Sequence, residues 1–65
     1  GENNMLKEND RIAWRYEGNK GYSEGFVKEV NGKMIRIANS LIERAEWFNG
    51  EEIEIEILNR TNRKN

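Results

Sequence analysis

The segment 51–58, EEIEIEIL, alternates glutamate and isoleucine with a period of two. Successive side chains of a β-strand point to opposite faces, so this pattern predicts a strand with one apolar and one charged face. A strand of this kind favours an antiparallel sheet that is covered on one side only. The apolar face carries Ile53, Ile55 and Ile57, and the charged face carries Glu52, Glu54 and Glu56.

Two earlier segments also read as strands. Residues 11–17 alternate in the same way, which places Ile12, Trp14 and Tyr16 on one face. Residues 22–30 form the second predicted strand, but its alternation slips next to Gly25. A glycine beside such a slip predicts a β-bulge or a sharp bend, as small closed sheets need.

A third strand is predicted over residues 33–38, after Asn31-Gly32. An Asn-Gly pair predicts a tight hairpin with a type I′ turn, because both central residues of that turn need positive φ. Residues 18–21, Gly-Asn-Lys-Gly, read as the loop between the first two strands. The first three strands therefore form a meander.

Residues 40–48 change period. Ser40 can cap a helix, and Glu43 three residues later completes a capping box. Helical spacing then gathers four apolar residues on one side, Leu41, Ile42, Ala45 and Phe48. Asn49-Gly50 supplies a left-handed stop. The alternative is another strand, but alternation fails at Leu41-Ile42 and at Trp47-Phe48, so we expect a two-turn helix.

The expected fold class is mainly β, a small antiparallel barrel or rolled sheet (β-β-β-α-β) with one short helix near residues 40–48. The 65 residues make a single small domain over 1–65. We expect a loose N-terminus over 1–9, which is polar apart from Met5 and Leu6. We expect a disordered basic tail over 59–65.

The composition excludes several chemistries. The chain has no cysteine and no histidine, so disulfides, thiolate or imidazole metal ligands and histidine-assisted nucleophiles are all excluded. The glutamate row of segment 51–58 lies on the solvated face, where catalysis would lack a buried carboxylate. We expect this row to form ion pairs with Arg15, Lys28 or Arg36. We expect no enzyme activity, no cofactor and no metal.

Charge and hydropathy bound the partners. The net charge of −1 argues against a general phosphate-binding protein. No apolar run approaches the roughly 18 residues of a membrane span, and no hydrophobic signal segment is present, so we expect a soluble, cytoplasmic chain without a membrane partner. Only 35% of the residues are hydrophobic, a thin core, so a homodimer is retained as an alternative.

Aromatic and basic residues interleave in the predicted first hairpin. This pattern suits single-stranded nucleic acid, whose bases stack on rings, and it equally suits a cage for a cationic peptide side chain. Trp14 and Phe26 are assigned to the core, whereas Trp47 falls away from the predicted helical stripe and is a candidate contact residue. With a protein or a nucleic acid as the partner, the candidate partner-binding residues are Arg15, Tyr16, Lys20, Tyr22 and Trp47.

Residues 6–30, LKENDRIAWRYEGNKGYSEGFVKEV, resemble the opening of small β-barrels of the Src-homology-3 and Tudor-like type. In that pattern a Gly-Asp pair precedes a hydrophobic-x-Trp strand, and a Gly-x-Val strand follows a loop. Here Asn9-Asp10 replaces Gly-Asp, and the matching positions are Ile12, Trp14, Gly25 and Val27. The resemblance implies a binding module that meets its ligands at rim loops.

Residues 35–57, IRIANSLIERAEWFNGEEIEIEI, resemble the swapped-hairpin core of the AbrB/MazE-like transcription factors and antitoxins. Ala38 stands where that family has a proline, and the family's final strand is missing. The resemblance implies an intertwined dimer whose basic residues Lys28, Lys33 and Arg36 face DNA.

The expected function is a non-enzymatic small binding or regulatory module, in the style of small phage or prophage proteins. It would contact a protein or nucleic-acid partner through the first-hairpin residues. The alternative is a dimeric AbrB-like DNA-binding regulator or antitoxin.

Overall fold

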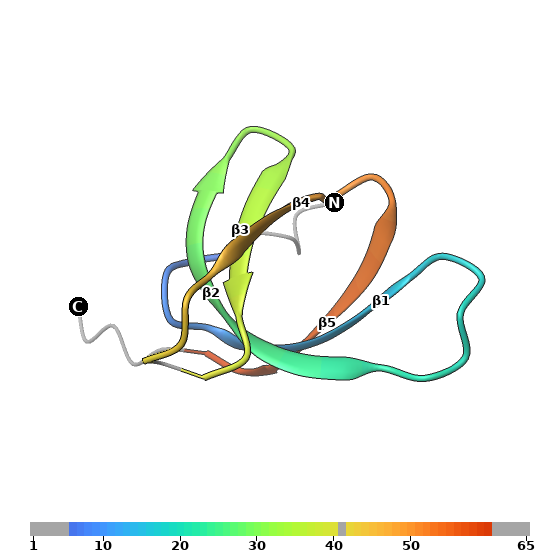
Figure 1. Ribbon diagram of the computed structural model, residues 1–65, viewed down its shortest axis with the longest axis horizontal. Coiled ribbons are helices and arrows are strands. Elements are labelled where there is room, and N and C mark those ends of the chain that lie inside the picture. Colours follow the sequence, from blue (N-terminus) through green and yellow to red (C-terminus); the bar gives the residue numbers. More distant parts are fainter. Residues whose placement is uncertain (1–5, 41, 61–65) are drawn as a thin grey trace.

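A computed structural model describes residues 6–40 and 42–60 of the chain (Figure 1). Within these ranges the chain forms one five-stranded antiparallel sheet in the order β4-β3-β2-β1-β5 and contains no helix. The first four strands are therefore a meander, and the last strand returns to pair with the first. The strands are β1 (Arg11–Tyr16), β2 (Ser23–Asn31), β3 (Met34–Ala38), β4 (Glu46–Asn49) and β5 (Ile53–Asn59).

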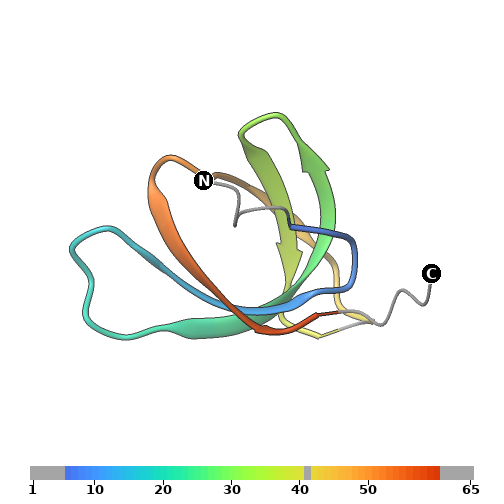
Figure 2. The same ribbon diagram turned by 180° about the vertical axis from the view of Figure 1, so that it is seen from behind.

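The sheet is rolled around β2, the longest strand. Residues 23–26 of β2 pair with β1, and residues 26–31 pair with β3. Figures 1 and 2 show β2 curving so that β1 and β5 lie along one half of it and β3 and β4 along the other. The predicted mainly β, rolled antiparallel class is confirmed.

Two features bend β2 at its centre. Gly25 is so close to β3 that an added Cβ would lie 2.7 Å from the Ala38 carbonyl oxygen and 2.8 Å from Ile37 Cγ2. Val27 lies opposite Ile37 while Glu29 lies opposite Arg36, so Lys28 is the extra residue of a β-bulge. The bulge or bend that the sequence predicts beside Gly25 is confirmed.

The second hairpin has the predicted place but a different turn. Asn31 pairs with Met34, so the two central residues are Gly32 and Lys33. Gly32 has a φ of 62°, and neither Asn31 nor Lys33 has positive φ. Glycine at the first central position is what a type II′ turn requires, so the expected type I′ turn is wrong.

The core lies on the concave inner face of the rolled sheet. Ile12 and Val27 are fully buried there, together with Ile35, Ile37 and Ile53. The predicted alternation of segment 51–58 is confirmed, because its isoleucines contribute to the core and its glutamates are exposed. Partly buried residues packed against this core are Leu6, Trp14, Phe48, Ile55 and Ile57.

The expected helix over residues 40–48 is wrong, because β4 occupies its second half. Strand pairing with β3 puts Phe48 opposite Ile35 on the inner face and Trp47 opposite Arg36 on the outer face. The capping-box spacing makes only a turn, in which the Glu43 N–H donates to the Ser40 carbonyl at 3.2 Å. Ile42, expected on the helix's apolar side, is 95% exposed, and Leu41 lies outside the described residues.

The first strand, β1, begins beside the end of the last strand, β5. Asp10 is fully buried, and its Oδ2 lies 3.9 Å from the Arg60 guanidinium at the end of β5. Residues 1–5 of the expected loose N-terminus and 61–65 of the expected tail lie outside the described residues. The part of the chain that the structure describes holds no helix of the length and apolarity that a membrane crossing needs.

We expect Gly25→Ala to destabilise the fold by about 1–3 kcal/mol, because the new methyl group would collide with the Ala38 carbonyl oxygen of the backbone and with the buried Ile37 side chain. Gly21→Ala is the matched control, since an added Cβ there meets nothing within 4 Å. Thermal unfolding of both variants checks this. A Gly25→Ala protein as stable as the Gly21→Ala protein would contradict the close approach of β2 and β3.

Candidate binding site

Three aromatic rings meet on the inner face, and we call them the aromatic cluster: Trp14 and Tyr16 of β1 and Phe48 of β4. The ring centroids of Trp14 and Phe48 lie 4.6 Å apart, and that of Tyr16 lies 5.5 Å from Trp14 and 6.2 Å from Phe48. β2 and β3 separate β1 from β4 in the sheet, so only the roll of the sheet brings these rings together. Such ring pairs each contribute about 0.5–1.5 kcal/mol beyond the area they bury.

A pocket of about 270 Å³ opens beside the aromatic cluster. Its apolar walls come from Trp14, Ile37 and Phe48. Its polar rim comes from β2, from the loop between β3 and β4, and from β4 itself, as Ser23, Asn39, Glu43, Arg44 and Glu46. Tyr16, which is 45% exposed, extends the aromatic surface beyond the pocket. The pocket is large enough for one side chain of a partner rather than for a drug-sized ligand.

Trp14 lines the pocket, but its indole Nε1 is not part of the open surface. This nitrogen is buried and has no hydrogen-bond partner among the described residues. A buried donor that stays unpaired costs about 1–3 kcal/mol, and a ligand in the pocket would reach it only if the Trp14 ring moved.

The rim of the pocket is acidic. Glu43 and Glu46 stand on it with one cation, Arg44, and within the described ranges neither carboxylate forms an ion pair. Aromatic faces attract cations through their quadrupoles, and carboxylates add a direct charge attraction. The pocket therefore suits a positively charged side chain.

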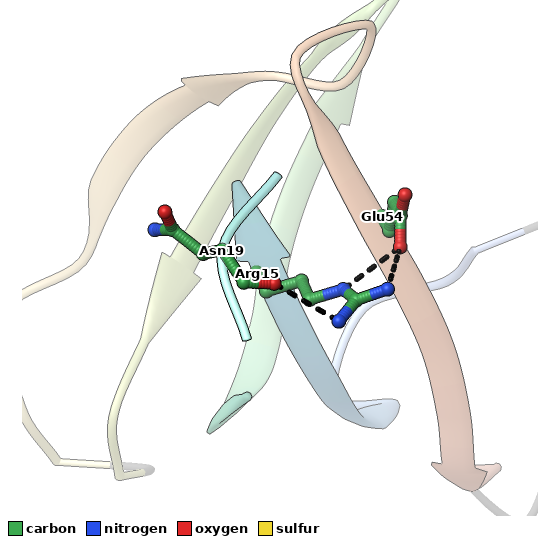
Figure 3. Close-up of polar contacts among 3 residues, drawn as sticks. All are labelled: Arg15, Asn19 and Glu54. Carbon is green, nitrogen blue, oxygen red and sulfur yellow. Dashed lines mark hydrogen bonds and ion pairs between the residues drawn. The ribbon is translucent and has the colours of Figure 1, made fainter. Parts of the chain in front are cut away.

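Arg15, a predicted partner-binding residue, is engaged within the protein (Figure 3). Its Nε donates to Glu54 Oε1 of β5 at 2.8 Å, and a second nitrogen donates to the Asn19 carbonyl at 2.9 Å (Figure 3). The guanidinium also lies 4.6 Å from the ring centroid of Tyr22. The hydrogen bond to Glu54 raises the pKa of the Arg15 guanidinium above its usual value, so the cation persists at every relevant pH.

We call this arrangement the Arg15 clamp, formed by Arg15, Asn19, Tyr22 and Glu54. It fastens the loop between β1 and β2 to β5. The predicted ion pair between the glutamate row and Arg15 is confirmed. Because its donors are already engaged, Arg15 serves the fold, and Tyr22 offers a partner only the surface that Arg15 does not cover.

The five predicted partner-binding residues do not form one surface. Tyr16 lies on the inner face with the aromatic cluster, whereas Arg15 and Tyr22 lie in the clamp. Lys20 is exposed on the loop between β1 and β2. Trp47, which is 43% exposed, lies on the outer face of β4 with its ring centroid 5.8 Å from the Arg36 guanidinium.

Sequence reasoning missed Phe48, Glu43 and Glu46 as site residues. Helical spacing places Phe48 on the apolar side of a predicted helix, so the sequence does not predict its inward position on a strand. No local pattern relates these residues to Trp14, because the roll of the sheet joins segments more than 25 residues apart in the sequence.

The residues of the DNA-binding alternative are also divided. Lys28 and Arg36 line a groove of about 670 Å³ together with Leu6, Lys7, Glu8, Glu29 and Val30. Arg36 is 3.2 Å from Glu29 there. Lys33 lies at the tip of the hairpin instead, 3.8 Å from Glu51.

Known proteins give no further guide to the site: no family model, no curated protein and no solved structure matches the chain. Neither sequence resemblance is therefore confirmed. The described residues include no group of three or more side chains that could hold a metal ion.

We expect Arg15→Lys to loosen the loop over residues 17–22, because lysine keeps the charge but loses the forked donors that reach two partners at once. Amide hydrogen exchange in this loop should become severalfold faster. Arg11→Lys is the control, since Arg11 makes only an exposed pair with Glu24 at 2.6 Å. Equal exchange in the two variants would show that the clamp does not order the loop.

Proposed function

We propose that this chain is a non-enzymatic binding module that holds a cationic side chain of a protein partner in the pocket beside the aromatic cluster. The observation that carries the proposal is the joining of three features in one place. These are the tilted, closely packed rings of Trp14 and Phe48, the half-exposed ring of Tyr16 beside them, and the carboxylates of Glu43 and Glu46.

A peptide segment matches these features. Its lysine or arginine would lie against the rings and between the carboxylates. Tyr16, beside the pocket, would contact the neighbouring residue of the peptide. Of the five residues predicted from the sequence, Tyr16 is therefore the best placed for this role.

The charge pattern supports a protein partner over a nucleic acid. Binding to phosphates draws its free energy from cations that are available to replace counterions. Here four of the cations already lie within 4 Å of a carboxylate, namely Arg11, Arg15, Lys33 and Arg36. The pocket rim is acidic as well. A polyanion would be repelled at the one place where the rings gather.

The small antiparallel sheet, a meander closed by a last strand beside the first, is compatible with the likeness to Src-homology-3 and Tudor-like barrels. The sequence positions that carry the likeness also have identifiable structural roles. Asn9 has a φ of 74°, a conformation that glycine adopts freely and asparagine tolerates, which accounts for Asn9 in place of the family's glycine. Asp10 is buried, and Gly25 permits the close approach of β3.

The test uses three peptides of identical sequence except for a central lysine, arginine or norleucine. Norleucine keeps the length of the lysine stem without its charge. Titration into ¹⁵N-labelled protein should shift the Trp14 indole N–H signal and leave that of Trp47 in place. We expect the norleucine peptide to bind about tenfold more weakly, the range of a desolvated cation–aromatic contact.

Two matched variants sharpen this test. Glu46→Gln should weaken binding of the lysine peptide about threefold by removing one rim charge. Tyr16→Ala should also weaken it when binding is measured well below the melting temperature, which the loss of two ring contacts lowers. Glu24→Gln, on the exposed pair with Arg11, is the control and should bind as the unaltered chain does. Equal binding of all three peptides, or a shift of the Trp47 indole alone, would contradict the proposal.

The groove that Lys28 and Arg36 share with Lys7 supports a second candidate, the dimeric DNA-binding regulator. That candidate loses the short helix on which its family resemblance depended. It requires a dimer, and it requires duplex binding that weakens steeply as salt rises. Sedimentation at several concentrations and a salt series with a random duplex separate it from the peptide-binding module.

A further inference from the structure

β5 forms one edge of the sheet and is the longer of the two edge strands. It has seven residues, whereas β4 at the other edge has four. In the described part of the chain, only β1 pairs with β5. Edge strands present backbone donors and acceptors to any extended segment that can lie alongside them.

The register identifies the backbone groups on the free side of β5. The Glu17 N–H donates to the Glu52 carbonyl at 3.1 Å, and Glu54 and Glu56 follow in the same register with β1. Backbone groups alternate in direction along an antiparallel pair, so the N–H and C=O groups of Glu54 and Glu56 point toward β1. Those of Ile53, Ile55 and Ile57 therefore point away from it.

At both its ends, the glutamate row next to this free edge has no cation directly opposite it on β1, and the diagonal Arg15 already pairs with Glu54. Glu54 has Arg15 opposite it, but Glu56 lies opposite Ala13 and Glu52 beside Glu17. A strand added to the free edge would put its outer-face side chains about 4.5–5.5 Å from these glutamates. Lysine or arginine at alternate positions of that strand would supply the missing charge.

The same row works against pairing between two copies of the chain. When two β5 strands pair, their isoleucines lie on the same face of the pair only if even-numbered residues lie opposite even-numbered residues. The registers with the greatest overlap place glutamates opposite glutamates, and like charges opposite each other destabilise a strand pair. The edge is therefore suited to a different chain with the complementary charge pattern.

We propose that the free edge of β5 accepts an extended segment of another protein in which lysine or arginine alternates with apolar residues. The added strand would bond to the outward backbone groups of Ile53, Ile55 and Ile57. Its basic side chains would lie beside Glu52 and Glu56, and its apolar side chains would cover the partly buried Ile55 and Ile57. This is recognition by strand addition, and it is independent of the pocket beside the aromatic cluster.

The experiment titrates the peptide acetyl-KVKVKVK-amide into the full chain and follows amide hydrogen exchange residue by residue. In the free protein, the amides of Glu54 and Glu56 should exchange slowly, and those of Ile53, Ile55 and Ile57 quickly. Saturating peptide should slow the second group at least about tenfold. Peptide binding that leaves these three amides fast, or slow exchange of all five without peptide, would overturn the proposal.

Peptide controls separate strand addition from simple charge attraction. A peptide of the same composition with its lysines in one block should bind at least about fivefold more weakly, because it cannot place lysine and valine on opposite faces. Two N-methylated isomers of the alternating peptide lose the backbone hydrogen-bond donors of opposite strand edges. One is methylated at every lysine amide and the other at every valine amide. Retained binding of both isomers would show charge attraction alone and would overturn the proposal.

Variants of the chain complete the test. Glu56→Lys should weaken the alternating peptide about fivefold or more, since it turns an attraction into a repulsion at an exposed position. Glu43→Lys, at the pocket rim, should leave this peptide unaffected while weakening the lysine peptide of the pocket. A loss of edge binding in Glu43→Lys equal to that in Glu56→Lys would contradict separate sites and overturn the assignment to β5.

Discussion

The close approach of β2 to β3 at Gly25 is the contact on which the rest of this small sheet depends. β2 turns from β1 to β3 where the backbone of Gly25 lies against that of Ala38, and a side chain at Gly25 would hold the two strands apart. The bulge at Lys28 adds to the bend. As a result, five strands enclose one core instead of spreading into a flat sheet with two exposed faces.

The pocket follows from that bend. Trp14 and Phe48 belong to strands that two others separate, and a flat sheet would hold them well beyond contact distance. The rolled sheet instead packs their rings against each other and leaves Glu43 of the loop between β3 and β4, and Glu46 of β4, at the rim. The same geometry leaves the Arg15 clamp on the outer surface, where it orders a loop and leaves the inner face to the rings.

Much of the fold could be predicted from the sequence, because strand alternation is a local signal. The buried isoleucines of 51–58, the bend at Gly25 and the pair between Arg15 and Glu54 all follow from neighbours in sequence or in register. The helix expected over residues 40–48 is wrong because the capping box and the helical spacing are local signals. Neither reports the unpaired edge of β3, and pairing with that edge is more favourable than a two-turn helix. Pairing with β3 buries Phe48, which a short isolated helix could not match.

The candidate site was less predictable, since its residues come from distant segments. Aromatic and basic interleaving in the first hairpin groups Tyr16 with Arg15 and Tyr22 as candidate partner-binding residues, although the three do not share one surface. Alternation alone places Tyr16 and Arg15 on opposite faces of β1, and that parity would have separated them. Nothing in the sequence around Glu43 or Glu46 indicates that these carboxylates stand at the rim of a pocket with Trp14.

The meeting of Asp10 and Arg60 has a consequence for how such a unit can be combined with others. Because the first and last strands pair along their length, the points where a polypeptide enters and leaves the sheet are adjacent. Splicing the unit into a surface loop of a host protein would then hardly stretch the host, and joining its ends would close only a short link. The exposed Gly18–Gly21 loop would be a natural place to reopen such a circularised chain.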